Sequence, residues 1–256
     1  MNRKYVRFHA PGDRYAVYGL LEGDQIKPLA GEPWLSQEST GESVAINEVA
    51  LLAPVQPSKI VCVGLNYRAH VAASQSSDNI PEYPLLFLKP PSSVIGPGGK
   101  IIHPGQSERV DYEAELGVVI GRTTKDVSID MAGESVFGYT CVNDVTARDL
   151  QKKDGQWSRA KGFDTFCPVG PWIVTELDHR DVLVEGIHNG RVRQSGRTSQ
   201  MIFDIPYLIS YISSIMTLCP GDLISTGTPS GIAPMKPGDT VAVSIEGIGT
   251  LENQMV

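Results

Sequence analysis

The sequence has little cysteine, and no two cysteines lie close enough along the chain to form a paired motif. Its four cysteines are spread over 256 residues, and none belongs to a C-x-x-C sequence. Structural zinc sites and disulfide scaffolds both depend on such clusters. The pattern argues against both, and we expect reduced structural thiols at Cys62, Cys141, Cys167 and Cys219.

Long hydrophobic runs and an excess of basic charge are also absent. No apolar stretch approaches the ~20 residues of a membrane span, and the start MNRKYVRFHAPGD lacks the apolar segment of a signal peptide. The formal net charge is −7 and the pI is about 5.3, with Lys and Arg scattered along the chain. We therefore expect a globular, cytoplasmic protein that binds neither a membrane nor nucleic acid.

Internal repeats, low-complexity tracts and a regular alternation of strands and helices are missing too. Short strands separated by turns dominate, and Asn189-Gly190 is a strong signal for a type I′ hairpin. One segment, FDIPYLISYISSIMTL, has helical spacing of apolar residues, with Asp204 as a candidate N-cap. The sequence predicts an α+β, mostly β fold with few helices.

The Pro-rich run LLAPVQPSK marks a candidate linker. We predict a small N-terminal β-rich domain and linker over residues 1–57 and a catalytic domain over residues 58–256. The glycine-rich sequence GPGGK lacks the spacing and the Ser or Thr of a phosphate-binding loop, so we interpret it as a turn.

Two carboxylates interrupt an otherwise apolar strand, RVDYEAELGVVIG, at Glu113 and Glu115. Side chains two residues apart in a strand point to the same face, and two carboxylates buried so close together repel each other unless they share a proton or a cation. Asp144 ends the next predicted strand, FGYTCVND, and strand ends are common places for ligands. Three such carboxylates predict a site for Mg²⁺, Mn²⁺ or Ca²⁺ that leaves about half of an octahedral shell open.

The same residues allow a simpler interpretation. Glu113 and Glu115 would lie on the solvent-exposed face of an edge strand, and Asp144 would cap a short helix running through Ala147 and Leu150. Glu-x-Glu is a weak signal alone, so the residues by themselves leave both interpretations open.

Six segments carry a resemblance to a known family. In chain order they are VGLNYRAHV, LFLKP, DYEAELGVVIG, NDVTARDLQ, AKGFDTFCPVGP and GDLISTGTPSGI. Together they resemble the fumarylacetoacetate hydrolase family across roughly residues 58–256. The resemblance implies that family's mixed β-sandwich roll with few helices, commonly found in homodimers. Residues 1–57 resemble the variable N-terminal extension of some members.

The resemblance also implies that Glu113, Glu115 and Asp144 bind Mg²⁺ or Mn²⁺. Family members use the cation to chelate the 2-oxo group and neighbouring carboxylate of 2-oxo and 2,4-dioxo acids. Their reactions include acylpyruvate hydrolysis, oxaloacetate decarboxylation and the isomerisation of hydroxymuconate-type acids, and all pass through a metal-bound enolate.

Five more residues match family positions at the site. Lys161, in AKGFDTF, is implied to neutralise developing enolate charge, and Lys89, Arg148, Gln151 and Thr228 to bind substrate. Each has a structural alternative: a lysine after an apolar strand often only snorkels, and a threonine in a turn can satisfy that turn. Arg148 and Gln151 are one helical turn apart, where they would recognise a distal acid or carbonyl, although Arg148 would equally pair with a structural carboxylate.

His70, in NYRAHV, matches the histidine that activates water in hydrolytic members. Those members carry a glutamate three residues later that orients the imidazole, whereas this chain has Ala73. Asp78 or Glu82 would substitute only if the following segment folds over the site. Losing the orienting acid weakens water activation, which favours decarboxylation or tautomerisation.

These observations lead to three functional hypotheses. The first is a divalent-metal hydrolase or decarboxylase that cleaves a C–C bond of a small 2-oxo or 2,4-dioxo acid. The second is an isomerase or tautomerase of 2-hydroxyhepta-2,4-diene-1,7-dioate-type acids. The third is a catalytically silent member that binds metal and ligand, for which Ala73 is the one feature in favour.

Overall fold

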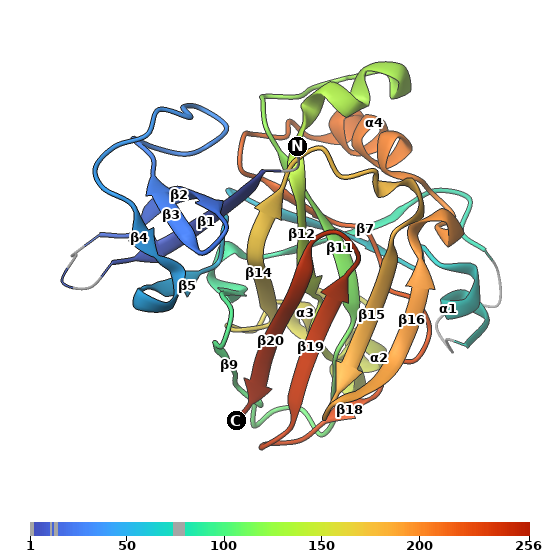
Figure 1. The fold of residues 1–256 in the computed structure, drawn as a ribbon. Coiled ribbons are helices and arrows are strands. Elements are labelled where there is room, and N and C mark those ends of the chain that lie inside the picture. Colours follow the sequence, from blue (N-terminus) through green and yellow to red (C-terminus); the bar gives the residue numbers. More distant parts are fainter. Residues whose placement is uncertain (1–2, 11, 13–14, 74–79) are drawn as a thin grey trace.

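The protein is described here by a computed structural model covering residues 3–10, 12, 15–73 and 80–256 (Figure 1). Strands of the largest sheet are β1 (Lys4–His9), β2 (Val17–Glu22), β3 (Gln25–Pro28), β4 (Val44–Ala45), β5 (Ala50–Leu52), β6 (Ile60–Gly64), β7 (Leu85–Lys89), β8 (Val94–Ile95), β11 (Ala114–Ile120), β12 (Val136–Asn143), β14 (Cys167–Val174) and β17 (Leu223–Ser225). Their order is β4-β3-β2-β1-β14-β12-β11-β17-β6-β7, with β5 beside β1 and β8 beside β14. The mostly β fold predicted from the sequence is confirmed.

Two smaller sheets complete the β-structure of the described residues. The first has the order β16-β15-β19-β20-β9, built from β9 (Lys100–Ile101), β15 (Leu183–His188), β16 (Arg191–Arg197), β19 (Thr240–Ile245) and β20 (Gly249–Met255). The second has the order β13-β10-β18, built from β10 (Val110–Asp111), β13 (Thr146–Ala147) and β18 (Pro234–Met235). Asn189 and Gly190 both have positive φ and join β15 to β16, which confirms the predicted hairpin.

Short helices connect the strands. The α-helices are α1 (Arg68–Ala73), α2 (Arg148–Asp154), α3 (Ser158–Lys161) and α4 (Ile205–Ile215), and the 3₁₀ helices are η1 (Ile46–Glu48), η2 (Pro91–Ser93), η3 (Ile129–Ser135), η4 (His179–Asp181) and η5 (Thr198–Gln200). Helix α4 is the one predicted from the sequence. The Asp204 carboxylate accepts a hydrogen bond from the Tyr207 N–H at 2.9 Å and so caps it.

The hydrophobic core lies on both faces of β11. Leu116, Val118 and Ile120 pack against α4 and against the inner face of the five-stranded sheet, which lies in front of β11 in Figure 1. Val119, on the opposite face, belongs to a second core with residues of β6, β12 and β14. Because every residue of β11 is buried, its odd-numbered face holds Glu115 inside the protein.

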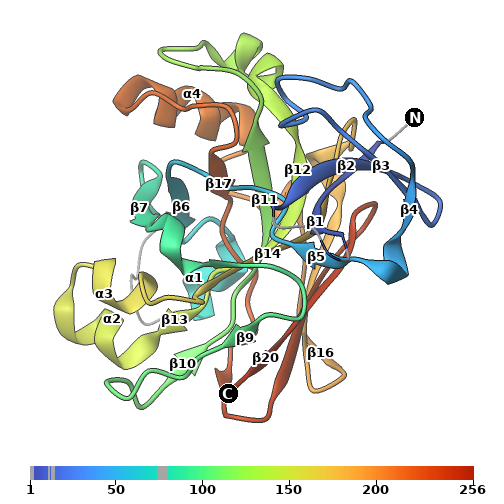
Figure 2. The same ribbon diagram turned by 90° about the vertical axis from the view of Figure 1, so that its left-hand side faces the viewer.

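The N-terminal strands form a lobe beside the rest of the molecule, coloured blue in Figures 1 and 2. Strand β1 nevertheless pairs antiparallel with β14, so the largest sheet runs through both parts of the chain. The division into domains at residues 57 and 58 stays a prediction.

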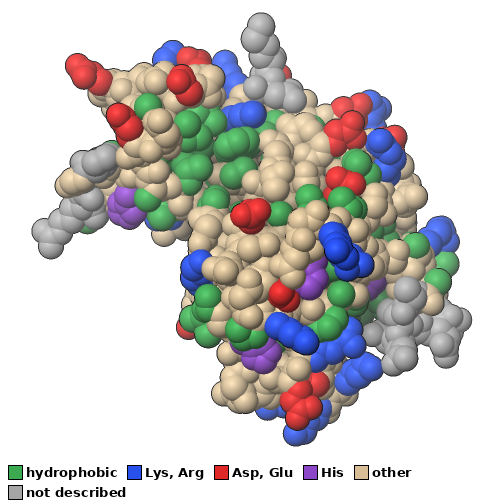
Figure 3. All heavy atoms as spheres, turned by 60° about the horizontal axis from the view of Figure 1, so that its bottom comes forward, with side chains coloured by type: hydrophobic (Ala, Val, Ile, Leu, Met, Phe, Trp, Pro, Cys, Tyr) green, Lys and Arg blue, Asp and Glu red, His purple; other side chains and the backbone are tan. Residues whose placement is uncertain are grey.

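The surface carries charges of both signs. Lys and Arg side chains are intermixed with Asp and Glu on the face shown in Figure 3. Within the described parts of the chain, no helix combines the length and the apolar character that crossing a bilayer requires.

Candidate metal centre and active site

Strand pairing brings the three predicted carboxylates together. Glu113 immediately precedes β11, Glu115 lies within it, and Asp144 immediately follows β12. Antiparallel register sets Ala114 opposite Asn143, and the Asp144 N–H donates to the Glu113 carbonyl oxygen at 2.9 Å. One carboxylate oxygen from each acid lies within 4.8 Å of the other two.

The solvent-exposed alternative for these acids is wrong. Glu113 is 5% exposed, Glu115 2% and Asp144 1%. Helix α2 begins after Ala147 with no side chain capping it, so Asp144 is not its cap. Three neighbouring carboxylates can be buried only if positive charge lies nearby or if some of them are protonated.

Two lysines supply part of that charge. Lys161 Nζ lies 2.8 Å from Glu113 Oε2 and 2.5 Å from Asp144 Oδ2, and Lys89 Nζ lies 2.6 Å from Asp144 Oδ1. Burial lowers the pKa of Lys161, but the Asp144 and Glu113 carboxylates raise it by more, so the ammonium form is favoured. Lys161 lies beside two of the three acids, near the proposed metal position that the resemblance implied for it, whereas Lys89, which the resemblance implied to bind substrate, pairs with Asp144.

Glu115 differs from the other two acids. Its Oε2 accepts hydrogen bonds from Ser225 Oγ at 2.5 Å and from the Gly227 N–H at 2.9 Å, and among the described residues it forms no ion pair. Its pKa is raised by burial and by the charges of Asp144 and Glu113. The pKa of Glu113 is lowered, since Lys161 and other cations outweigh the opposing effect of burial.

This donor set fits a hard divalent cation. All three candidate ligands are carboxylate oxygens, which Mg²⁺ and Mn²⁺ prefer. Among the described residues no cationic side chain pairs with Glu115, and a cation held between the three acids would favour its ionised form. Among the described His, Cys, Asp and Glu residues, no other three bring their ligand atoms this close together.

Arg148 and Gln151 lie together on α2, as predicted from their spacing. Arg148 Nη1 donates to Gln151 Oε1 at 2.6 Å, and its Nη2 donates to Glu113 Oε1. Arg148 Nε donates to Asp111 Oδ2 at 2.9 Å. The sequence analysis missed Asp111, although it continues the i, i+2 spacing of Glu113 and Glu115 along the same segment.

The Thr228 hydroxyl is already engaged. It donates to the Ala114 carbonyl oxygen at 2.8 Å and accepts from Gln194 Nε2 at 2.8 Å. These bonds tie the turn after β17 to β11 and β16, and donating to a substrate carboxylate would require the hydroxyl to give up its bond to Ala114. Gln194, which the sequence analysis also missed, is fully buried and has no local sequence signal.

His70 lies on α1 and is 7% exposed. Burial lowers its pKa, so the neutral imidazole is favoured. No carboxylate among the described residues is hydrogen-bonded to it. Glu82 is exposed, and Asp78 lies outside the described residues.

One small cavity unites most of the predicted residues. It is lined by His70, Glu113, Glu115, Asp144, Arg148, Gln151, Lys161 and Thr228, together with Val63, Gly64, Leu65, Phe87 and Trp157. Lys89 does not line this cavity, but its ammonium group pairs with the Asp144 carboxylate. The volume of this cavity, about 20 Å³, suits a single ion or water molecule. To admit a keto acid, lining side chains such as Phe87 and Trp157, whose rings pack edge to face, must move.

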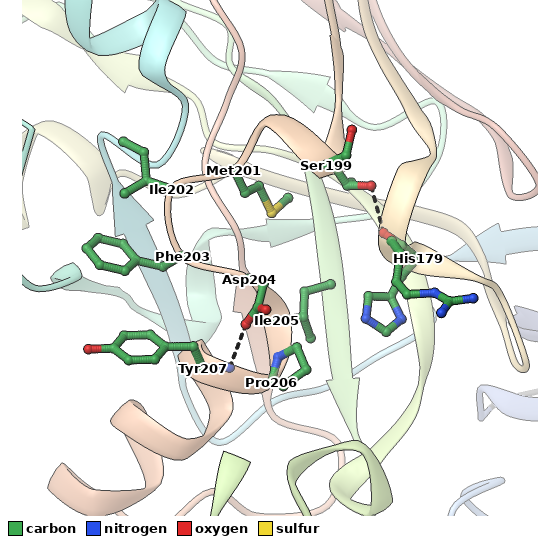
Figure 4. A pocket seen from close by; sticks show the side chains of 11 residues that line it. His179, Ser199, Met201, Ile202, Phe203, Asp204, Ile205, Pro206 and Tyr207 are labelled. Atoms are coloured by element: carbon green, nitrogen blue, oxygen red, sulfur yellow. Dashed lines mark hydrogen bonds between the residues drawn. The ribbon is translucent and has the colours of Figure 1, made fainter. Parts of the chain in front are cut away.

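A second cavity is far larger but has different chemistry (Figure 4). About 750 Å³ in volume, it lies between η4, η5 and the start of α4, with Met201, Phe203 and Tyr207 in its wall. Its only carboxylate among the described lining residues is Asp204, which caps α4. None of the predicted site residues contributes to it.

Comparison with known proteins shows the family to which the chain belongs. Residues 59–256 match the family described as fumarylacetoacetate (FAA) hydrolase C-terminal, and residues 3–54 match the one described as Rv2993c-like, N-terminal. The chain belongs to the fumarylacetoacetate hydrolase family. The resemblance found in the sequence is thus confirmed.

Three similar proteins illustrate the range of that family. Protein Rv2993c of Mycobacterium tuberculosis is 50% identical, over 90% of this chain and 87% of the relative. Oxaloacetate tautomerase YisK of Bacillus subtilis is 41% identical, over 96% and 84%. The crystal structure of 5-carboxymethyl-2-hydroxymuconate delta-isomerase from Mycobacterium smegmatis has a TM-score of 0.92 at 47% identity, covering 99% of both chains.

Proposed function

We propose that this protein is a divalent-metal enzyme that enolises a small 2-oxo acid. The observation that carries the proposal is the convergence of three buried carboxylates beside Lys161 and His70 in one cavity. Glu113, Glu115 and Asp144 would hold Mg²⁺ or Mn²⁺, which when bound acts as a Lewis acid toward the 2-oxo group.

Lys161 stabilises the charge that develops on the substrate. Its two carboxylate partners keep it as an ammonium at the cavity wall, and its Nζ lies 4.8 Å from the centre of the Phe87 ring. A fixed cation in a site that excludes water favours a negatively charged enolate over the neutral keto acid. Lys89 acts indirectly by fixing Asp144.

His70 transfers the proton. As a neutral imidazole lining the same cavity, it can accept a proton from the carbon next to the 2-oxo group and return it elsewhere. The residue three positions later is Ala73, and no described carboxylate orients the imidazole for attack by water. Reactions that need no attacking water are therefore favoured.

Keto–enol tautomerisation is our first assignment, supported by the similarity to oxaloacetate tautomerase YisK. C–C bond cleavage is the second candidate. Decarboxylation of an oxaloacetate-type acid generates the same enolate without an attacking water, and the same Lys161 charge would stabilise it. Hydrolysis of acylpyruvates comes third, because it depends on water activation by His70.

Substrate recognition falls to Arg148 and Gln151. Both line the cavity, and the guanidinium carries the positive charge and paired donors that suit a carboxylate at the far end of the acid. We also propose that the protein works in the cytoplasm, and that it does so as a homodimer, as the family resemblance implies.

The test is a turnover assay with Mg²⁺ and Mn²⁺ on oxaloacetate, acetylpyruvate, fumarylpyruvate and 2-hydroxyhepta-2,4-diene-1,7-dioate. Ultraviolet absorbance reports enol formation, and release of CO₂ or pyruvate reports C–C cleavage. We expect absorbance changes without loss of carbon, abolished by excess EDTA. Full activity in excess EDTA would overturn the metal assignment, and metal and oxalate binding without any turnover would indicate a silent member.

A further inference from the structure

Asp111 is a buried acid that the proposed chemistry does not use. It lies in β10, is fully buried, and stands outside the group of three carboxylates that approach one another. Strand β10 pairs antiparallel with β13, so that Asp111 is opposite Thr146 and Val110 opposite Ala147. This register sets Asp111 beside Arg148, the first residue of α2.

Arg148 has five N–H donors, and the described residues account for three of them. Its Nε donates to Asp111 at 2.9 Å, its Nη1 to Gln151 at 2.6 Å, and its Nη2 to Glu113. The remaining two donors, one on each outer nitrogen, have no partner within the part of the chain that the structure describes. Since the side chain lines the small cavity, these donors are the ones available to a ligand.

The two acidic partners of Arg148 are not equivalent. Glu113 also pairs with Lys161 and is a candidate metal ligand, so its charge is shared. Asp111 contacts only arginines among the described ion pairs, and Arg109 holds it from outside through Nε at 2.9 Å and Nη2 at 3.1 Å. A cation bound by Glu113 would weaken the attraction between Glu113 and Arg148. Asp111 would then remain as the acidic partner of Arg148.

We infer that Asp111 is a positioning residue, which anchors Arg148 through Nε so that its outer nitrogens face the cavity and bind the distal carboxylate of a dicarboxylic 2-oxo acid. The inference rests on the proposed function and narrows its substrate class to dicarboxylates. A guanidinium held in one orientation can bind a carboxylate through two parallel hydrogen bonds. A guanidinium that rotates freely adopts the required orientation less often.

The experiment compares two ligands of equal chain length, 2-oxoglutarate and 2-oxopentanoate, which differ in the distal carboxylate. Affinities are measured by isothermal titration of the Mg²⁺-loaded protein, without turnover. We expect the wild type to prefer 2-oxoglutarate by about tenfold, as for one charge-assisted contact. Asp111→Asn should lose most of this preference while its affinity for 2-oxopentanoate stays within about twofold.

Asp149→Asn is the matched control. Asp149 is the next residue on α2, and its carboxylate accepts from Ser107 Oγ at 2.5 Å and the Glu108 N–H at 3.1 Å rather than from Arg148. This variant should keep the preference. The inference would be overturned if Asp111→Asn lowered the affinity for both ligands equally, because that would show a merely structural role. It would also be overturned if Asp149→Asn lost the preference for 2-oxoglutarate to the same extent as Asp111→Asn.

A double-mutant cycle completes the test. Arg148→Ala should abolish the preference, and adding Asp111→Asn to it should cause no further loss. Should Asp111→Asn fail to fold, the Arg148→Lys variant decides. Lysine keeps the positive charge but has no Nε–H to bond with Asp111. Undiminished preference for 2-oxoglutarate in that variant would refute the proposed role of Asp111. Wild type that binds both ligands equally overturns this inference alone, whereas wild type that binds neither contradicts the proposed function.

Discussion

Two cavities of this protein differ in size and in chemistry, and the smaller one is lined by the groups for which we propose a catalytic role. The cavity beside β11 holds about 20 Å³ and is lined by three carboxylates, two cationic side chains and a histidine. The cavity beside α4 holds about 750 Å³, yet its Asp204 only caps a helix and Arg180 pairs with Asp178. The volume of a cavity therefore does not by itself identify an active site. A better guide is a cluster of buried charged side chains that neighbouring opposite charges do not fully neutralise.

The largest expected effect comes from removing one carboxylate of the small cavity. Glu115→Gln keeps the shape and the hydrogen bonds from Ser225 and Gly227 but removes the charge. We expect metal binding to weaken and turnover to fall by about 100-fold or more. Glu134→Gln, at an exposed ion pair with Arg122, is the control and should leave both unchanged. Normal metal affinity in Glu115→Gln would contradict the assignment of Glu115.

Lys161→Met should act on both catalysis and stability. We expect turnover to fall by ~10²-fold because the enolate loses its fixed cation. Without metal, Glu113 and Asp144 lose a buried partner, at a cost of about 3 kcal/mol in unfolding free energy. Mg²⁺ should therefore raise the melting temperature of this variant more than that of the wild type. Equal metal stabilisation of the two proteins in a thermal scan would argue against a shared charge network.

Trp157→Ala sharpens the comparison of cavity size. The Trp157 ring packs edge to face on Phe87 at the small cavity, and a Cβ added at Gly64 would lie 2.7 Å from it. Removing the ring enlarges the site, so we expect relative kcat/KM to shift by several-fold from oxaloacetate toward the longer fumarylpyruvate. Substrate ratios identical to those of the wild type would show that Trp157 does not limit substrate length.

The smallest effect is expected at the large cavity. Asp204→Ala removes the N-cap of α4 and should lower unfolding stability by about 1 kcal/mol. The Mg²⁺-dependent rate should not change, since Asp204 belongs to neither the carboxylate group nor the small cavity. A loss of turnover larger than the loss of folded protein would mean that the two cavities are coupled.

Local sequence patterns predicted much of this architecture. The two-residue spacing of Glu113 and Glu115, and the position of Asp144 at a strand end, made a cation site one of two interpretations, and the family resemblance favoured it over a solvent-exposed strand. Capping and helical spacing predicted α4, and Asn189-Gly190 predicted the hairpin between β15 and β16.

Features that depend on distant pairing could not be predicted in the same way. The Ser225 hydroxyl donates a hydrogen bond to Glu115, and the Ala114 N–H donates one to Gln194 Oε1. Both bonds form where segments far apart in sequence meet. The ion pair between Asp111 and Arg148 likewise depends on the register of β10 with β13. Local residue patterns do not specify such register.

Metal titration tests the central claim most directly. Chelator-treated wild-type protein, titrated with Mn²⁺ in a calorimeter, should bind one ion per chain, and turnover of oxaloacetate should return in proportion to occupancy. The Glu115→Gln protein should bind no ion at the same concentrations. Absence of Mn²⁺ binding by the folded wild type, or undiminished turnover after complete chelation, would contradict the account.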